Sequence, residues 1–459
     1  MGWSQIRSIM KSFQEKCPNL GRAVILVGAH LSVALFLAPG LGSPREAYSR
    51  VVYPFFWESN PPPVQGLEGR MARLVNWDGI HFLSILRNGY TRTDLPGPHS
   101  VHEYRDNVSF FPGFPLLASG VQKVTGLSAE MALALTSPLA AVLMWFYFLR
   151  LLQRWRGPDS SVSRVSYLIA ALLFPTLFYT LVAYSEATFL AAWLGLLLGW
   201  DQFRWPASNH PASRWLWLLF AAFHGFFMCL TRSAGLAAAI TPLVTEIIYQ
   251  IFSKRPGRRF EPAMMLASLG VSLVAMAGQA AYFGYLHWLF GDWKWHYVVQ
   301  KAGYGNELNL AGLWDWRTYF PFPPDARFTP WLSQLMVPLA LGLLIWLSIR
   351  CLPSALGKAR GPVVPAEQRY RGLLGAISAW SLFMIAFLGT LALRNPGMFR
   401  YALPVWLAVL LAASSLRQIE LTLFGLVPRS RGLRVAAGFV LVLTQLFFIA
   451  RFTRGYWVS

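Results

Sequence analysis

The chain has 459 residues, of which 55% are hydrophobic and 15% aromatic, and only 13% are charged. A soluble chain of this length would carry about a quarter charged residues, so the composition indicates an integral membrane protein. Apolar runs of membrane-spanning length recur from residue 23 to residue 450 with no long polar interval. No room is left for a separate soluble domain of ordinary size. We therefore expect a single membrane domain over residues 1–459.

Charge and cysteine content exclude two further classes. The formal net charge is +20, but the basic residues are spread through short loops between the apolar runs. Nucleic-acid binding needs basic residues gathered on one water-facing surface, so no nucleic-acid partner is expected. Cys17, Cys229 and Cys351 lie far apart without pairing or metal-ligand spacing, which argues against a disulfide framework and a zinc site.

The apolar runs predict an all-α polytopic membrane protein with about eleven transmembrane helices. The first run follows several basic residues and resembles a signal peptide, but the many later spans lead us to expect that it is retained. The predicted spans are residues 23–40, 128–149, 164–183, 187–203, 215–230, 235–252, 263–290, 332–349, 372–393, 401–416 and 435–450.

The basic loops assign a side to each connection. With the basic N-terminus inside, the loops "RLLQRWR", "SKRPGRR", "ARGPVVPAEQRYR" and "PRSRGLR" all fall inside too, as the positive-inside rule requires. The outer face then receives a long first loop, residues 42–127, in which we expect amphipathic interfacial helices. Residues 110–126 within it are apolar but short and carry two prolines, which favours a segment that does not cross. "NVS" at 107–109 is an N-glycosylation sequon on the same side.

Asp78 is a carboxylate within "RLVNWDGIHFLSILRNGY", a stretch otherwise suited to lie along a membrane surface. A carboxylate shielded by aromatic neighbours such as Trp77 gains proton affinity, which suits a general base for a hydroxyl. Asp before Gly and an apolar run is also a common helix N-cap, and residue type alone leaves both interpretations open. His81 shares a helical face with Asp78; orienting the carboxylate, binding substrate and a plain surface position all remain open for it.

Other ionisable residues occupy the same outer face. Glu186 in "VAYSEATF" starts a span at the outer interface, where charged groups usually face a cavity or a partner. The alternative is that Ser185 caps the helix and Glu186 lies in its first turn. Arg232 in "CLTRSAGL" and Arg394 and Arg400 in "LRNPGMFRYALP" lie beside outer helix ends. Each arginine either reaches lipid headgroups or holds a phosphate in bidentate fashion.

Together these residues suit a lipid-linked phosphate substrate. Arginines would stabilise a leaving phosphate, and a carboxylate would deprotonate an attacking hydroxyl. The sequence has no Gly-rich phosphate loop, Walker-type lysine or nucleotide-binding strand–helix unit. A nucleotide-driven or nucleotide-sugar enzyme is therefore disfavoured.

The motifs, in this order, resemble the PIG-V family of mannosyltransferases, which add the second mannose to the glycosylphosphatidylinositol (GPI) anchor precursor. The matching stretches are "NWDGIHFLSILRNGY", "SFFPGFPLL", "FPTLFYTLVAYSEATFLAAWLG" and "LTRSAGL". They fall within residues 23–252, whereas in residues 263–450 only "RNPGMFRYALP" looks similar, so the match there is looser.

The resemblance implies a glycosyltransferase of the GT-C class, which takes sugars from polyprenyl-phosphate donors and keeps catalytic acids in the first outer loop. It implies an inverting transfer of mannose from polyprenyl- or dolichyl-phosphate-mannose to a lipid-linked glycan acceptor, with Asp78 as general base. Glu186 is the second catalytic candidate. The candidates for substrate and phosphate binding are Trp77, His81, Tyr184, Arg232, Arg394 and Arg400.

The same resemblance bears on cofactors, partners and location. No cofactor is expected, because phosphate is already a good leaving group and the chain lacks an Asp-x-Asp motif; metal assistance by an acidic pair stays open. The expected partners are membrane lipids, the polyprenyl-phosphate-sugar donor, a glycolipid acceptor and a small membrane subunit. Either a bacterial cytoplasmic membrane with a periplasm-facing site or an endoplasmic reticulum membrane with a lumen-facing site fits.

Two other classes of function stay open. A lipid or sugar transporter or flippase would show an internal repeat with broken helices in matching halves. No such symmetry is visible, and the unusual residues lie at one face. A non-catalytic subunit of a glycosylation complex would tolerate the loss of Asp78.

The predicted topology can be tested by cysteine labelling. Cysteines introduced at residues 254–259 and 358–371 should label only from the cytoplasm, and those at 95–105 and 300–312 only from the far side, because the first two loops are strongly basic. A membrane-impermeant maleimide applied to intact and permeabilised cells measures this. Labelling of both groups from one side would contradict an active site on a single face.

Overall fold

The computed structural model describes residues 18–37, 66–91, 107–157, 160, 162–206, 211–252, 260–304, 338–349, 353, 364–387, 398–416 and 430–453. Within these ranges all regular structure is helical, which confirms the predicted all-α fold. In chain order the helices are α2 (Pro18–Leu37), α4 (Gly66–Ala72), α5 (Asp78–Asn88), α6 (Gly113–Thr125), α7 (Ala129–Trp155), α8 (Arg164–Leu172), the 3₁₀ helix η2 (Pro175–Thr180), α9 (Glu186–Arg204), α10 (Pro211–Thr231), α11 (Gly235–Ala239), α12 (Thr241–Phe252), α13 (Pro262–Phe290), α14 (Trp295–Tyr304), α16 (Ala366–Phe387), α17 (Met398–Ser415) and α19 (Arg431–Thr453).

The long helices are those of an integral membrane protein. Six segments of the described chain are long and apolar enough to cross a bilayer. They are Pro18–Leu35, Ala129–Trp155, Ala212–Thr231, Gly235–Phe252, Pro262–Phe290 and Gly432–Ala450. The predicted number of eleven spans is not confirmed by this set.

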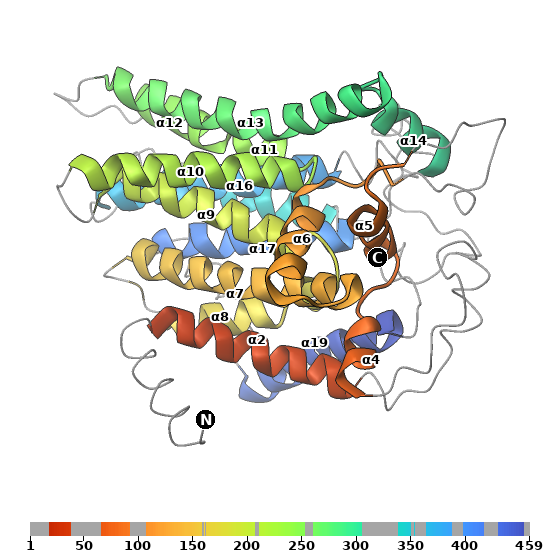
Figure 1. The fold of residues 1–459 in the computed structure, drawn as a ribbon. Coiled ribbons are helices and arrows are strands. Elements are labelled where there is room, and N and C mark those ends of the chain that lie inside the picture. The colour runs from red at the N-terminus through yellow and green to blue at the C-terminus, as the bar shows by residue number, and fades with distance from the viewer. Residues whose placement is uncertain are drawn as a thin grey trace.

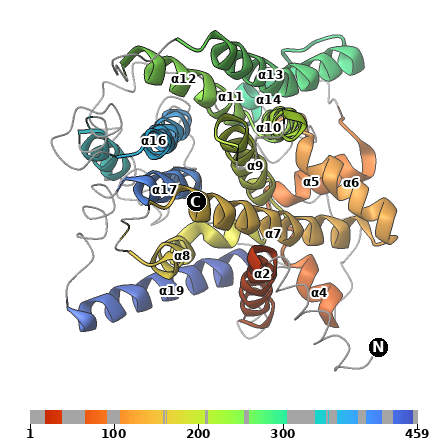
Figure 2. The ribbon, with the colours of Figure 1, turned by 90° about the vertical axis from the view of Figure 1, so that its left-hand side faces the viewer.

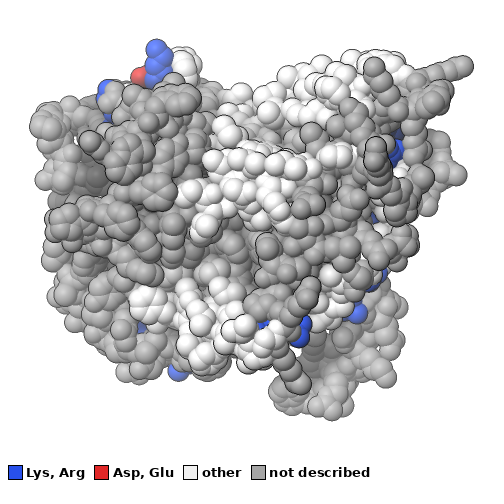
Figure 3. Space-filling view, turned by 180° about the vertical axis from the view of Figure 1, so that it is seen from behind, with Lys and Arg blue, Asp and Glu red and all other residues white. Residues whose placement is uncertain are grey.

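Apolar side chains cover the outside of the bundle, as a lipid-facing surface requires. Helices α10, α13 and α19 expose many large hydrophobic residues. Examples are Trp215, Leu219, Phe223, Leu266, Trp288, Val435, Phe439 and Val440. In Figure 3 the described part of one face is largely uncharged, with lysine and arginine at its margins.

One predicted span is wrong. The sequence suggested a continuous helix over residues 164–183, but α8 ends at Leu172 and the shorter η2 begins at Pro175. Proline has no amide hydrogen to donate and pushes the residue before it out of the helical region. Phe174 accordingly has φ −67° and ψ 123°, an extended conformation. The break turns the chain so that residues 181–185 form a non-helical approach to α9.

Helix α9 is the axis of the bundle. Every one of its residues from Glu186 to Arg204 is buried, and it lies between α7 and α10 (Figure 2). Glycine permits this close packing: a Cβ at Gly199 would lie 2.8 Å from the backbone nitrogen of Ala221 in α10. Small residues at such contacts let helix backbones approach in a membrane.

Buried ion pairs hold the C-terminal end of α9. Asp201 is fully buried and accepts hydrogen bonds from Arg154 Nε of α7 at 2.7 Å and from Arg371 Nε and Nη2 of α16 at 2.7 and 3.1 Å. Arg204 pairs with Glu246 of α12 at 3.4 Å. Because buried charges are stable only when they are paired, these contacts tie α7, α12 and α16 to α9.

The short helices α4, α5, α6 and α14 gather at one end of the long helices (Figure 1). The apolar side of α5, expected to lie along the membrane surface, is instead buried against α6 and α7, with Ile80, Phe82, Leu83 and Ile85 in the core. Helix α6 has 13 residues, a length of about 20 Å. It is shorter than the roughly 30 Å of a hydrocarbon core, in line with a segment that does not cross.

Asn107, which precedes α6, forms hydrogen bonds with residues at the C-terminal end of α5 and directly after it. Its side chain is fully buried, donates to Ser84 Oγ at 3.1 Å and to the Gly89 carbonyl at 2.9 Å, and accepts from the Thr91 amide at 3.2 Å. The asparagine of the "NVS" sequon is therefore a buried residue whose hydrogen bonds stabilise the folded chain.

Replacing Asn107 should destabilise the protein. Asn107→Ala removes the hydrogen bonds to the Gly89 carbonyl and the Thr91 amide, at a net cost of about 0.5–1.5 kcal/mol for each bond. Thermal unfolding of the purified protein in detergent measures the loss. The control is Asn88→Ala, since Asn88 is exposed at the end of α5. Equal melting temperatures for the two variants would contradict the stabilising role of Asn107.

Candidate active site

Four charged side chains from distant parts of the sequence meet where the short helices join the bundle. Asp78 is the first residue of α5, Glu186 is the first residue of α9, Arg232 directly follows α10, and Arg400 lies in the first turn of α17. Asp78 and Arg400 are 322 residues apart in the chain. We call these four residues the charge cluster.

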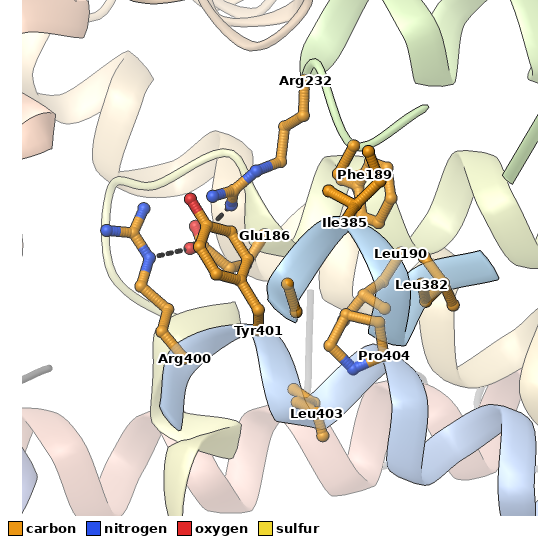
Figure 4. Close-up of a pocket in the computed structure, with 12 residues that line it drawn as sticks. Glu186, Phe189, Leu190, Arg232, Leu382, Ile385, Arg400, Tyr401, Leu403 and Pro404 are labelled. Atoms are coloured by element: carbon orange, nitrogen blue, oxygen red, sulfur yellow. Dashed lines mark hydrogen bonds and ion pairs between the residues drawn. The ribbon is translucent and has the colours of Figure 1, made fainter. Parts of the chain in front are cut away.

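The charge cluster is a continuous chain of contacts. Arg400 donates from Nη2 to Asp78 Oδ2 at 2.6 Å and from Nε to Glu186 Oε1. Arg232 Nη1 approaches the same Glu186 oxygen at 2.7 Å. Figure 4 shows both guanidinium groups pointing at the Glu186 carboxylate from opposite sides. The order of contact is therefore Asp78, Arg400, Glu186, Arg232.

The two carboxylates differ in their exposure to solvent. The Glu186 side chain is 7% exposed and contacts two arginines, whereas the Asp78 side chain is 18% exposed and contacts Arg400. The two carboxylates and two guanidinium groups balance in charge, which makes their burial tolerable. Asp78 is the more exposed of the two carboxylates.

Backbone packing brings Asp78 to this place. The Ala183 amide donates to the Leu74 carbonyl at 3.0 Å, which joins the approach to α9 to the approach to α5. Gly79 permits the contact, because a Cβ there would lie 3.1 Å from the Ala183 carbonyl oxygen. Trp77, directly before Asp78, has φ +52°, a left-handed value that is uncommon for a residue other than glycine.

The structure bears on the capping alternatives for the two carboxylates, and it agrees in part with the one for Glu186. The residue in the N-cap position of α5 is Trp77, so Asp78 is already helical. Ser185 occupies the N-cap position of α9 but makes no side-chain capping hydrogen bond. Glu186 does lie in the first helical turn, where a negative charge is favourable, but its oxygen is directed to the two arginines.

Three tyrosines support the guanidinium groups. Arg400 lies over the rings of Tyr184 and Tyr179, 4.5 and 5.3 Å from their centroids, and Arg232 lies 4.9 Å from the centroid of Tyr401. Such cation–π contacts stabilise and orient a cation. Tyr184, a candidate for substrate binding, is buried and its ring contacts the Arg400 guanidinium. Sequence reasoning missed both Tyr179, which lies within the motif stretch that ends in Glu186, and Tyr401, the neighbour of Arg400.

The remaining predicted site residues divide into three cases. His81 is buried and stacks on Phe110 with ring centroids 4.4 Å apart, so it is not a surface histidine. Burial lowers the pKa of His81 to about 4, although Asp78 raises it, so the imidazole is neutral at pH 7. Trp77 is half-buried next to Asp78. Arg394 lies outside the described residues.

A pocket opens beside the charge cluster between α9, α16 and α17 (Figure 4). Glu186, Arg232 and Arg400 form its polar side, and its cavity volume is about 20 Å³. The rest of its wall is mostly apolar and consists of Phe189, Leu190, Ala234, Leu382, Ile385, Ala386, Tyr401, Leu403 and Pro404. The arrangement places two guanidinium groups next to an apolar wall.

Within the described ranges no three His, Cys, Asp or Glu side chains are grouped as a metal site. Asp78 and Glu186 are the acidic pair that could assist a metal, but Arg400 lies between them and contacts both. The geometry of these two carboxylates fits a guanidinium better than a metal cation.

No protein-family model matches the chain, and no curated protein matches it. Among solved structures, the chain is similar to the oligosaccharyltransferase of Archaeoglobus fulgidus tethered with an acceptor peptide containing the NVT sequon, at 15% identity and a TM-score of 0.40. The archaeal oligosaccharyltransferase AglB from the same organism, in complex with an inhibitory peptide and a dolichol-phosphate, has 14% identity and a TM-score of 0.40.

Both of these alignments cover 95% of this chain and 56% of the oligosaccharyltransferase, so the chain spans little more than half the length of that protein. ArnT from Cupriavidus metallidurans in the apo state has 14% identity and a TM-score of 0.37, over 85% of this chain and 73% of ArnT. At this level of similarity no residue role transfers from one protein to another.

Removing one cation from the charge cluster should be costly. Arg400→Met takes the shared partner from Asp78 and Glu186, and breaking a buried ion pair in this way costs about 3–5 kcal/mol. Arg87→Met breaks an ion pair with Glu130 whose side chains are 48% and 29% exposed, which should cost no more than about 1 kcal/mol. Thermal unfolding in detergent compares the two variants, and equal losses would show that the charge cluster adds no special stability.

Proposed function

We propose that the protein is a membrane glycosyltransferase that takes a sugar from a polyprenyl-phosphate donor. The observation that carries the proposal is the charge cluster, in which the partly exposed carboxylate Asp78 contacts the guanidinium group of Arg400, and Glu186 joins Arg400 to Arg232. A carboxylate can accept the proton of an attacking hydroxyl. Guanidinium groups can hold a phosphate and stabilise its charge as it leaves.

The donor class is proposed from the residues around the pocket beside the arginines. The cavity of about 20 Å³ is too small for the donor in this conformation, but its lining sets the chemistry that a donor meets once it widens: Arg232 and Arg400 for a phosphate, and an apolar wall that includes Leu190, Leu382 and Ile385 for the first part of a hydrocarbon chain. A soluble nucleotide sugar would instead call for polar groups around the base and ribose. The pocket therefore favours a phosphate that is attached to a lipid.

Asp78 is the general base in this proposal, and Glu186 is not. Asp78 is the more exposed carboxylate and has one guanidinium contact, whereas Glu186 is buried between two. Glu186 is suited to set the spacing of the two arginines. The rings of Tyr184 and Tyr179 contact the Arg400 guanidinium and help to orient it.

The reaction is a single displacement at the anomeric carbon. The acceptor oxygen forms a bond to that carbon, the carbon–oxygen bond to the phosphate breaks, and the phosphate leaves with the electron pair between Arg232 and Arg400. The hydroxyl proton passes to Asp78. One displacement inverts the configuration, so a β-linked donor gives an α-glycoside.

The finer assignment to mannose rests on the motif resemblance. The stretches around Asp78, Glu186 and Arg232 resemble the PIG-V family, so we propose mannose as the sugar and a GPI-precursor-like glycolipid as the acceptor. The cluster lies where the positive-inside rule predicts the outer membrane face. The site is accordingly proposed to face the periplasm or the lumen.

Asp78→Asn tests the proposed function. Asparagine keeps the size of the side chain but cannot accept the proton, so turnover should fall by about two orders of magnitude or more. The measurement is transfer of radiolabelled mannose from polyprenyl-phosphate-mannose to extracted glycolipid acceptors by the purified protein.

Asp292→Asn is the matched control, since Asp292 accepts a local hydrogen bond from the Lys294 amide away from the cluster and should keep full activity when changed. Near-normal turnover by folded Asp78→Asn protein would rule out Asp78 as the base. It would leave a non-catalytic subunit as the better description.

A further inference from the structure

Arg400 is shared between the two carboxylates of the site. Its Nη2 donates to Asp78 at 2.6 Å and its Nε donates to Glu186. Within the described residues Arg400 is the ion-pair partner of Asp78, so the proposed base is held by a group that is also proposed to bind the donor. The same N–H group cannot serve both the carboxylate and a phosphate.

Among the described residues, the positive and negative charges of the charge cluster are equal in number, and the cavity beside them is small. The two arginines are balanced by the two carboxylates, so a phosphate must compete with a carboxylate for a guanidinium group. The neighbouring cavity of about 20 Å³ holds about one water molecule. A donor phosphate that approaches the guanidinium groups from the side of the carboxylates therefore competes with a carboxylate contact.

One oxygen of the Glu186 carboxylate is available for a ligand. Its second oxygen, Oε2, is buried and accepts no hydrogen bond within the described part of the chain, although the residue lines the pocket. Buried polar atoms in folded proteins are nearly always hydrogen-bonded. A ligand with a hydroxyl group, such as a donor sugar, would supply the missing bond.

We propose that Arg400 couples donor binding to activation of the base. In the donor-free protein Arg400 holds Asp78; the incoming phosphate takes over Arg400 Nη2 and releases the Asp78 carboxylate. A carboxylate that loses a neighbouring cation becomes a stronger proton acceptor. Asp78 is then ready to deprotonate the acceptor only when the leaving group is in place, and Arg400 is a positioning residue as well as a phosphate ligand.

This inference rests on the proposed function but makes a separate prediction about binding. If the carboxylates compete with phosphate, removing either negative charge should tighten phosphate binding. Asp78→Asn and Glu186→Gln should each bind farnesyl phosphate about tenfold more tightly than the wild type, since a hydrogen bond to a charged group is worth roughly that factor or more. If the carboxylates only orient the arginines, both variants should bind it equally or more weakly.

The measurement is titration of the purified protein in detergent with farnesyl phosphate and, separately, with farnesol. Asp201→Asn is the matched control, because Asp201 is also a buried carboxylate between two arginines but lies at the other end of α9. It should leave the affinity for farnesyl phosphate unchanged. Thermal unfolding reports that each variant is folded, and the two site variants test the idea independently.

Turnover provides a readout that a structural role would not produce. Asp78→Asn should lower kcat and the donor KM together, because it removes the base and also the competitor of the donor phosphate. Arg400→Lys should raise the donor KM, since an ammonium group cannot reproduce the planar fork of a guanidinium.

The outcomes separate the two proposals. If the wild type binds farnesyl phosphate no better than farnesol, the phosphate site fails and both proposals fall. If it prefers farnesyl phosphate but neither Asp78→Asn nor Glu186→Gln tightens binding, only the coupling through Arg400 is overturned. Equal tightening by Asp201→Asn would show a general effect of charge and would also overturn the coupling.

Discussion

Charge buried in a low-dielectric interior must be paired, and this constraint organises the protein. Glu186 at the start of α9 cannot be buried unless cations meet it there. Arg232 from the end of α10 and Arg400 from the start of α17 do so. The pairing therefore brings the ends of α9, α10 and α17 together, and through Arg400 it also joins them to the start of α5 at Asp78.

The two ends of α9 show how similar chemistry can serve different purposes. At Asp201 both carboxylate oxygens accept hydrogen bonds from arginines, and the ion pairs act as a structural tie. At Glu186 one oxygen receives both arginines, and the other accepts no hydrogen bond from the described residues and belongs to a side chain that lines the pocket. A carboxylate with an oxygen of this kind beside a pocket is suited to exchange a contact with a ligand.

The non-helical segments also position residues of the site. The break at Pro175 and the non-helical residues before Glu186 allow Ala183 to pair with Leu74 through the backbone. Gly79 keeps the two segments close. Asn107 in turn holds the loop that follows α5. The position of Asp78 thus depends on several contacts of the non-helical segments. Long apolar helices alone would not create these contacts.

The sequence by itself determined the membrane class and the all-helical fold, and it predicted Asp78, Glu186, Arg232 and Arg400 on one face, because apolar runs and basic loops are local properties of the chain. It left open whether the carboxylates were helix caps, and it predicted one continuous span over residues 164–183. Only the tertiary structure decided that Arg400 joins two carboxylates, one of them 322 residues away. It also showed that Tyr179 supports Arg400 and that His81 is buried. Such contacts depend on how the helices approach one another, which no local pattern encodes.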